Sequence, residues 1–273
     1  MKKINFTDQQ LRQIIKDYQE NGISMQKIGN QFQVSKTVIS RVLKENNIKI
    51  NKDNHIYKAD YDKFEIINTP EKAYWLGFIA ADGCNYNRKT NATIKINIHQ
   101  KDIKHLEKFR DFMNSNVNIT THVQDKGFSN HTPMCVITFN SLKMSTDLID
   151  KGIVPNKSLI LKPPKIDEKY WLPYILGYFD GDGSIYKTVQ GTYGISFEGT
   201  KETLQWINNI LTISNTLEKR NNNDKNNYYI RCGGINKPYQ ILKRLYETVD
   251  IHLDRKYAIY KNLETVVLNR NIE

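Results

Sequence analysis

The chain of 273 residues is poor in cysteine, and this scarcity argues against two classes of small domain. Its three cysteines are Cys84, Cys135 and Cys232, an odd number. No Cys-x-x-Cys pair occurs among them, so neither a disulfide framework nor a zinc site is indicated. Reduced thiols in a cytosolic protein are the simpler interpretation.

Long apolar runs are also missing from the sequence. The opening MKKINFTDQQ has no apolar core of a signal peptide, and no stretch is long enough to span a bilayer. We therefore expect a cytoplasmic protein without a membrane partner. An organelle or phage origin is also compatible with these features. The chain lacks the first and last residues of an intact intein. The Asn130–His131 pair has no companions that would make an HNH nuclease site.

Basic residues are what the chain has in excess. The 40 Lys and Arg residues outnumber the 29 Asp and Glu residues, for a formal net charge of +11. The excess is spread over the first 70 residues and over the remainder, which suits a long footprint on a polyanion better than a basic tail does. An apolar fraction of 39% and a charged fraction of 25% are typical of a globular domain.

Two apolar stretches share one pattern, YWLGFIAADG at 74–83 and YILGYFDGDG at 174–183. Each predicts a buried helix that ends at a glycine in the left-handed conformation. Small residues stand four positions apart in both, as Gly77 and Ala81 and as Gly177 and Gly181. A glycine inside a helix costs about 1 kcal/mol relative to alanine. Close approach of a second helix would offset that cost, so the pattern predicts that the two helices pack together.

Each stretch also places an aspartate at the expected helix C-terminus, where the helix dipole disfavours an anion. If the helices lie side by side, Asp82 and Asp182 are adjacent and repel each other. A divalent cation would relieve this repulsion and organise phosphate chemistry. The alternative is a pair of buried helices with incidental Asp-Gly turns.

The two stretches resemble the duplicated motif of the LAGLIDADG homing endonucleases in their single-chain form, and the resemblance covers residues 70–265. It implies an α+β fold, a pseudo-two-fold tandem αββαββα repeat whose saddle-shaped sheets bind double-stranded DNA, in a monomer. It also implies metal-assisted, site-specific cleavage with Mg²⁺ or another divalent cation such as Mn²⁺. In the family the later aspartate binds the metal, which assigns that role to Asp82 and Asp182. Asp180 is expected to be structural, since the first copy has Ala80 at the matching position.

The resemblance further assigns catalytic roles to Gln100, Lys157 and Lys256. Such side chains polarise water or stabilise developing negative charge. We expect asymmetry at Gln100, because Gly199 is placed opposite it in the second half. The alternative for the two lysines is a phosphate clamp or an ordinary surface position.

The residues that follow each motif repeat the order helix, hairpin, helix, hairpin, helix. We expect a polar linker at 51–69, a first half at 70–165 and a second half at 166–273. Helices must cover the apolar face of each sheet, which leaves the polar face for DNA.

Strand phase predicts which side chains lie on the polar faces to contact bases or phosphates. In the first half these are Tyr86, Arg88, Thr90, Thr93, Lys95, Asn97, His122 and Gln124. In the second half they are Tyr186, Thr188, Gln190, Ser196, Arg220, Tyr229 and Arg231. The alternative for any single member is an ordinary solvated position.

Residues 1–50 predict a small all-α helix-turn-helix module with helices at 8–20, 25–32 and 36–46. Ser24 and Ser35 are the expected N-caps. The segment resembles the helix-turn-helix of invertase-type recombinases, although Gln33 replaces the usual turn glycine. Its third helix would present to a major groove Lys36, Thr37, Ser40, Arg41 and Lys44. A plain three-helix module with a solvated basic face is the alternative.

The predicted function is a site-specific double-strand DNA endonuclease. An RNA maturase that binds its host intron RNA is one alternative, and a DNA-binding regulator that does not cleave is another. Retention of both aspartates favours cleavage.

Overall fold

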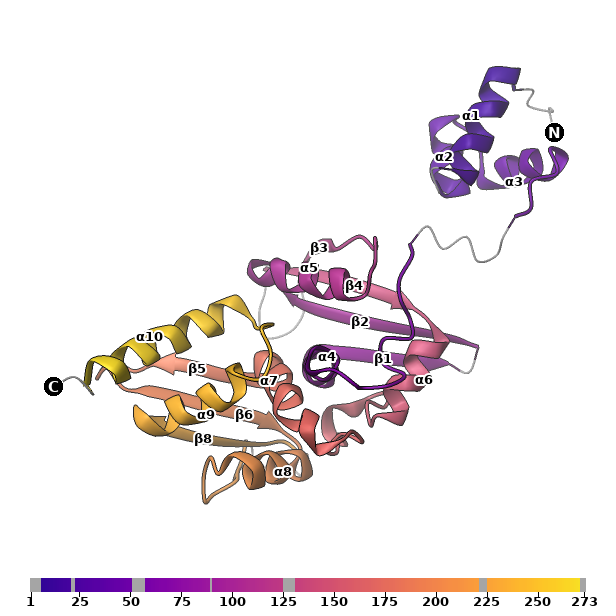
Figure 1. Ribbon diagram of the computed structural model, residues 1–273. Coiled ribbons are helices and arrows are strands. Elements are labelled where there is room, and N and C mark those ends of the chain that lie inside the picture. The colour runs from indigo at the N-terminus through magenta and orange to yellow at the C-terminus, as the bar shows by residue number, and fades with distance from the viewer. Residues whose placement is uncertain are drawn as a thin grey trace. The chain divides into compact units, whose positions relative to one another are not determined.

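The computed structural model describes residues 6–20, 23–50, 57–88, 90–124, 131–220 and 225–270. The chain divides into two compact units, Met1–Lys58 and Ala59–Glu273. Figure 1 shows the elements of both units along the chain.

The described part of the first unit is a three-helix cluster made of α1 (Asp8–Gln19), α2 (Met25–Gln31) and α3 (Lys36–Glu45). Its buried core consists of Ile14, Tyr18, Ile28, Ile39, Val42 and Leu43. The side chain of Ser24 accepts a hydrogen bond from the Lys27 amide, as expected for an N-cap. Ser35 occupies the N-cap position of α3, but its side chain makes no capping bond, which corrects our expectation.

The turn between α2 and α3 has a left-handed residue where our expected helix-turn-helix would have a glycine. Gln33 adopts a φ of 55°, the left-handed region that normally favours glycine. A Cβ on Gly29 would come within 2.6 Å of the Val34 carbonyl oxygen, so only glycine lets the turn fold back onto α2.

The second unit repeats one order of elements. Its first half contains α4 (Pro70–Asp82), β1 (Gly83–Arg88), β2 (Asn91–His99), a 3₁₀ turn η1 (Gln100–Asp102), α5 (Ile103–Phe112), β3 (Thr120–Gln124), β4 (Thr132–Asn140) and α6 (Leu142–Asp150). Two further 3₁₀ turns, η2 (Lys157–Leu159) and η3 (Glu168–Tyr170), precede the second half. That half contains α7 (Trp171–Asp182), β5 (Gly183–Lys187), β6 (Tyr193–Gly199), α8 (Lys201–Leu211), β7 (Glu218–Lys219), β8 (Tyr228–Gly234), α9 (Asn236–Tyr246) and α10 (Asp254–Arg270).

The described strands form two antiparallel four-stranded sheets with matching orders, β1-β2-β4-β3 and β5-β6-β8-β7. The registers match as well, because Gly83 pairs with Ile96 and Gly183 pairs with Phe197. The fold is therefore α+β with a tandem αββαββα repeat, as the sequence predicted.

Each sheet buries one face and leaves the other open. Along β2, Ile94, Ile96 and Ile98 are buried, whereas the residues between them are only partly buried. Helices α5 and α6 contact the first sheet, and α8, α9 and α10 contact the second. Because side chains alternate along a strand, the uncovered faces carry the polar residues.

The two halves meet through α4 and α7, which lie side by side near the centre of the second unit (Figure 1). A Cβ on Gly77 would lie 2.0 Å from the Tyr174 carbonyl oxygen, and one on Gly177 would lie 1.9 Å from that of Tyr74. The small residues predicted to allow close helix packing therefore do so, and in a reciprocal manner.

The glycines that end these two helices correct our expectation of a left-handed cap. Gly83 has a φ of −81° and Gly183 a φ of −90°, both of which any residue can adopt. What requires glycine is space, because a Cβ on Gly183 would lie 2.2 Å from the Phe179 ring. The chain thus passes directly from each helix into the first strand of its sheet.

The segment before α4 also differs from its prediction. We expected residues 51–69 to be a linker, of which 51–56 lie outside the described residues. Residues 59–69 instead belong to the second unit. Phe64 is fully buried and its ring centroid lies 5.9 Å from that of Phe112. A few buried apolar side chains therefore attach this polar segment to the second unit, although the segment shows no helical or strand periodicity.

Candidate active site

Asp82 and Asp182 are brought together where α4 and α7 end. The carboxyl carbon of Asp82 lies 3.4 Å from the place a Cβ on Gly181 would occupy, next to Asp182 in the chain. Asp82 is half-buried. Asp182 is exposed to solvent, but it lines cavities whose walls surround its carboxylate with protein atoms. Burial and the neighbouring Asp182 charge raise the pKa of Asp82 to about 7. Burial also raises the pKa of Asp182.

The two predicted lysines lie at the ends of the same helices. The Lys157 ammonium donates to the Ala81 carbonyl oxygen at 3.0 Å. Lys256 donates to three carbonyl oxygens of the other helix end, those of Phe179 (2.6 Å), Asp180 (2.9 Å) and Gly183 (2.6 Å). Both side chains are buried, and burial lowers the pKa of Lys256 to about 8. Cations at helix C-termini offset the dipole that disfavours the two aspartates.

Each lysine acts on the carboxylates through its charge. Lys256 is the strongest of the cations that hold down the pKa of Asp82, and Lys157 is the strongest for Asp182. The strongest cation at each of the two aspartates therefore comes from the other half. The site is therefore shared between the halves, because each aspartate has its strongest neighbouring cation in the other half.

Two small cavities flank the aspartates. One of about 260 Å³ lies beside Asp82, and its polar lining includes Asn97, His99, Lys101 and Arg255. The other, of about 210 Å³, lies beside Asp182, and its lining includes Lys157, Glu198, Thr200 and Asn227.

The counterpart of Gln100 differs from our expectation, whereas the catalytic role of Gln100 stays a prediction. Gln100 is exposed on η1 and is not among the residues that line these two cavities. The strand registers also place Gly199 opposite Ile98, so the counterpart of Gln100 in the second half is Lys201.

His99 lines the cavity beside Asp82, and it was not among the predicted site residues. Its Nδ1 accepts a hydrogen bond from the Lys101 amide at 3.1 Å, so the neutral ring carries its proton on Nε2. The signal was available, since His99 continues the polar phase of Lys95 and Asn97 along β2.

Strand phase placed most of the predicted DNA-contacting residues on the uncovered sheet faces. In the first sheet, the partly or fully exposed residues on that face are Tyr86, Arg88, Thr93, Lys95, Asn97, His122 and Gln124. In the second sheet, they are Tyr186, Ser196, Tyr229 and Arg231, with Arg220 following β7. Thr90, Thr188 and Gln190 instead lie in the hairpin turns. The Thr188 hydroxyl is committed to Thr192 at 2.7 Å.

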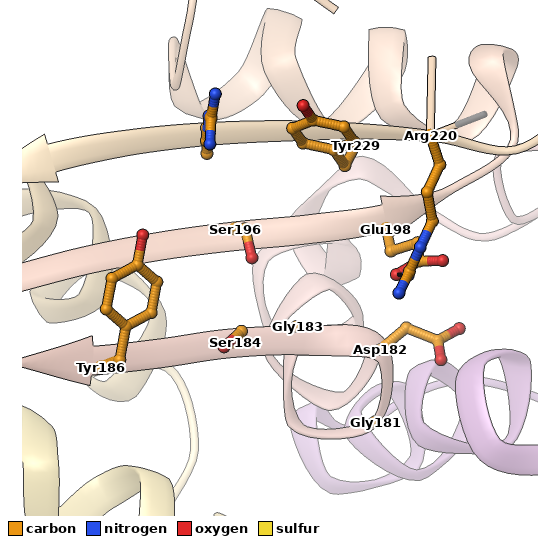
Figure 2. A pocket seen from close by; sticks show the side chains of 10 residues that line it. Gly181, Asp182, Gly183, Ser184, Tyr186, Ser196, Glu198, Arg220 and Tyr229 are labelled. Atoms are coloured by element: carbon orange, nitrogen blue, oxygen red, sulfur yellow. Dashed lines mark ion pairs between the residues drawn. The ribbon is translucent and has the colours of Figure 1, made fainter. Parts of the chain in front are cut away.

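Two acidic residues on the second face were not predicted. Glu198 pairs with Arg220, and Glu218 pairs with Arg231 at 3.3 Å and accepts a hydrogen bond from Tyr229. Figure 2 shows Glu198 and Arg220 at a cavity of about 530 Å³ that Asp182 also lines. These acids fix the orientation of side chains that have the chemistry to contact DNA.

The predicted surface residues of α3 in the first unit are accessible. Lys36, Thr37, Arg41 and Lys44 are exposed and Ser40 is partly exposed. Arg41 also lies 3.9 Å from Glu45, a weak surface ion pair.

The donor set at the aspartates fits a hard divalent cation. Two carboxylates, one half-buried and one exposed, offer oxygen ligands, which is the chemistry that Mg²⁺ prefers while it keeps several waters. Among the described residues, no group of three or more His, Cys, Asp and Glu side chains could hold a metal ion. The remaining ligands would then be water, a bound phosphate, or carbonyl and amide oxygens of the chain. Within the same described ranges, none of the helices has the length and hydropathy to cross a membrane.

The raised pKa of Asp82 predicts a pH-dependent stability cost. Between its ordinary pKa of 3.8 and its folded value of about 7, the unfolded chain loses the proton first, so stability falls as pH rises through this interval. We expect the Asp82→Asn variant to gain stability over wild type as pH rises from about 4.5 to about 7.5. Urea unfolding in EDTA measures the difference.

The matched control is Asp150→Asn, which removes an exposed carboxylate from the end of α6. Its stability relative to wild type should not change with pH in this way. If the difference in unfolding free energy between Asp82→Asn and wild type were the same at both pH values, Asp82 would not destabilise the fold as pH rises.

The fold and the site define a duplicated α+β domain with a two-carboxylate centre between two open sheet faces. No protein-family model matches the sequence, and no curated protein sequence matches it.

Solved structures do resemble the chain at low identity. The meganuclease I-SmaMI bound to uncleavable DNA is 13% identical over 71% of this chain and 89% of that one, with a TM-score of 0.48. The I-LtrWI LAGLIDADG homing endonuclease bound to target DNA is 12% identical over 76% and 92%, with a TM-score of 0.45. The LAGLIDADG meganuclease I-AabMI bound to uncleaved DNA is 13% identical over 75% and 92%, with a TM-score of 0.46.

Proposed function

We propose that the chain is a site-specific double-strand DNA endonuclease that acts as a monomer with Mg²⁺ or Mn²⁺. The observation that carries the proposal is the meeting of Asp82 and Asp182, one from each half, beside two uncovered polar sheet faces. The net charge of +11 favours a polyanionic substrate.

The two aspartates would hold the cation, and a bound cation would polarise the scissile phosphate and lower the pKa of a water. The chain's own residues prepare this centre. Lys157 and Lys256 oppose the rise in the pKa of the carboxylates and so favour their ionised form. The polar sheet faces orient the duplex, and each aspartate serves one strand.

The first unit extends the footprint in this proposal. Its third helix would enter a major groove and present Lys36, Thr37, Ser40, Arg41 and Lys44 to bases and phosphates. Removing residues 1–58 should then weaken DNA binding without abolishing cleavage, because the aspartates belong to the other unit.

The test is a cleavage assay on a supercoiled plasmid library with random inserts. Wild type should linearise a fraction of the library in Mg²⁺ or Mn²⁺ and none of it in EDTA. Sequencing of the ends should return one recurrent site with staggered cuts. The Asp82→Asn/Asp182→Asn variant should bind DNA that carries this site in a gel-shift assay and leave it intact.

The matched control is Asp150→Asn/Asp250→Asn, which removes one exposed carboxylate from each half. It should cut like wild type. Binding without cutting in either metal would favour the DNA-binding regulator instead. Stimulated splicing of an intron transcript, with no cleavage of DNA, would favour the maturase.

A further inference from the structure

Asp180 is a buried acid in α7 that has no counterpart in the first half, where Ala80 occupies the matching position. It is 1% exposed, its carboxylate contacts Tyr74 of α4, and it is among the residues that line the cavity beside Asp82. Its Oδ2 accepts two hydrogen bonds, from the Tyr74 hydroxyl at 2.6 Å and from the Leu253 amide at 2.8 Å. One oxygen therefore joins a helix of the first half to a loop of the second.

The partners of Tyr74 hold this arrangement in one orientation. Its hydroxyl lies 3.1 Å from Nε2 of His105, and because the hydroxyl proton goes to Asp180, the His105 ring must be the donor. Burial lowers the pKa of His105 to about 3, so the ring is neutral and has one proton to donate. The hydrogen bonds thus run from His105 to Tyr74 to Asp180.

The loop residue Leu253 belongs to a segment, residues 252–256, that the first half grips at further points. The Lys108 ammonium contacts the His252 carbonyl oxygen at 3.1 Å and the Asp254 carboxylate at 2.6 Å. Arg255 Nε donates to Asp102 at 2.9 Å. Lys256 in this segment donates to three carbonyl oxygens at the end of α7, whereas Lys157, its counterpart in the first half, donates only to that of Ala81.

Segment 252–256 carries two of the cations that act at the Asp82 side of the site. Arg255 lines the cavity beside Asp82. Lys256 is inserted beneath the end of α7 through its three carbonyl contacts. Displacement of the segment would move both charges away from Asp82 and leave Lys157 in place.

We infer that Asp180 is a positioning residue, which holds segment 252–256 against the first half so that Lys256 and Arg255 lie beside Asp82. Its bond to Tyr74 makes the Asp82 side of the site depend on contact between the halves. The first half has no acid at the matching position, and the segment that carries Lys157 is held instead by the Thr200 and Thr203 hydroxyls, which donate to the Leu161 carbonyl oxygen. The consequence for cleavage rests on the proposed function, whereas the positioning itself does not.

Lysine labelling without DNA tests the positioning. Wild type, Asp180→Ala, Asp180→Asn and Tyr74→Phe are treated briefly with acetic anhydride, and peptides containing Lys256 and Lys157 are quantified by mass spectrometry. Loss of a hydrogen bond to a carboxylate should raise the labelling rate of Lys256 in Asp180→Ala by about tenfold. Tyr74→Phe should raise it less. Asp180→Asn keeps an acceptor oxygen but removes the negative charge that favours the unreactive ammonium form of Lys256, so it should raise the labelling rate by less than Asp180→Ala does.

Lys157 is the internal control, because it is also buried and lies at the end of the other helix. Its labelling should not change in any variant, and thermal unfolding should show that each variant is folded at the labelling temperature. Equal increases at Lys157 and Lys256, or no increase at Lys256 in Asp180→Ala, would overturn the inference.

Cleavage of each strand tests the consequence on a plasmid site selected with wild type. Asp82→Asn and Asp182→Asn, each alone, identify the strand that each aspartate serves. Asp180→Ala should slow the Asp82 strand by about tenfold and accumulate nicked circles. Equal slowing of both strands would refute the positioning role. If wild type cuts no DNA, the proposed function fails, and the labelling result still decides the inference.

Discussion

Gly177→Ala should strongly destabilise the second unit. The added Cβ would lie 1.9 Å from the Tyr74 carbonyl oxygen and 2.8 Å from its carbonyl carbon. Both atoms belong to a helix backbone, so no side-chain rotation relieves the clash and α4 and α7 must separate. We expect a loss of about 3 kcal/mol or more, the upper range for overpacking, measured by thermal and urea unfolding.

Gly77→Ala should behave in the same way, because its Cβ would lie 2.0 Å from the Tyr174 carbonyl oxygen. The matched control is Gly233→Ala in β8, where the added Cβ would lie 3.7 Å from its nearest neighbour, an ordinary contact. A Gly177→Ala protein as stable as the Gly233→Ala protein would show that the helix pair does not set the fold.

Lys256→Met should lower stability and activity together. Methionine has a similar length but donates no hydrogen bond, so the Asp180 and Gly183 carbonyl oxygens lose the Lys256 donor. The Phe179 carbonyl keeps the Gly183 amide as a partner. With unsatisfied buried groups costing about 1–3 kcal/mol each, we expect a loss of about 3 kcal/mol, measured by urea unfolding.

The same substitution removes the strongest cation that opposes the rise in the pKa of Asp82. Since burial and Asp182 already raise that pKa to about 7, the carboxylate should be more protonated at neutral pH in the variant. Cleavage by Lys256→Met should therefore recover in part as pH rises. Lys157→Met is the comparison, because it loses one carbonyl contact and should lose less stability. Equal losses from the two variants would contradict the difference between the helix ends.

The N-terminal unit shows how far local sequence signals extend. Periodic apolar residues and the Ser24 cap were sufficient to predict its three helices. The glycine missing from its turn was a poor guide, because Gln33 adopts the left-handed conformation without it. Tertiary contacts around the turn override the local preference of a single residue.

Two predictions were wrong for a similar reason, the linker at 59–69 and the counterpart of Gln100. Low periodicity predicted a linker, yet one fully buried aromatic side chain, Phe64, ties the segment to the second unit. Sequence spacing suggested Gly199 as the counterpart of Gln100, whereas the registers of β1 with β2 and of β5 with β6 show that it is Lys201.

By itself, the sequence determined the elements of the repeat, the close approach of two helices and the two aspartates at their ends. It did so because glycine spacing and apolar alternation are local patterns with one low-energy solution. The tertiary structure decided how the charges are distributed. It placed Lys157 and Lys256 on helix-end carbonyls and joined Asp180 to Tyr74 of the other half. Such contacts depend on distances between residues far apart in the chain, which no local pattern encodes.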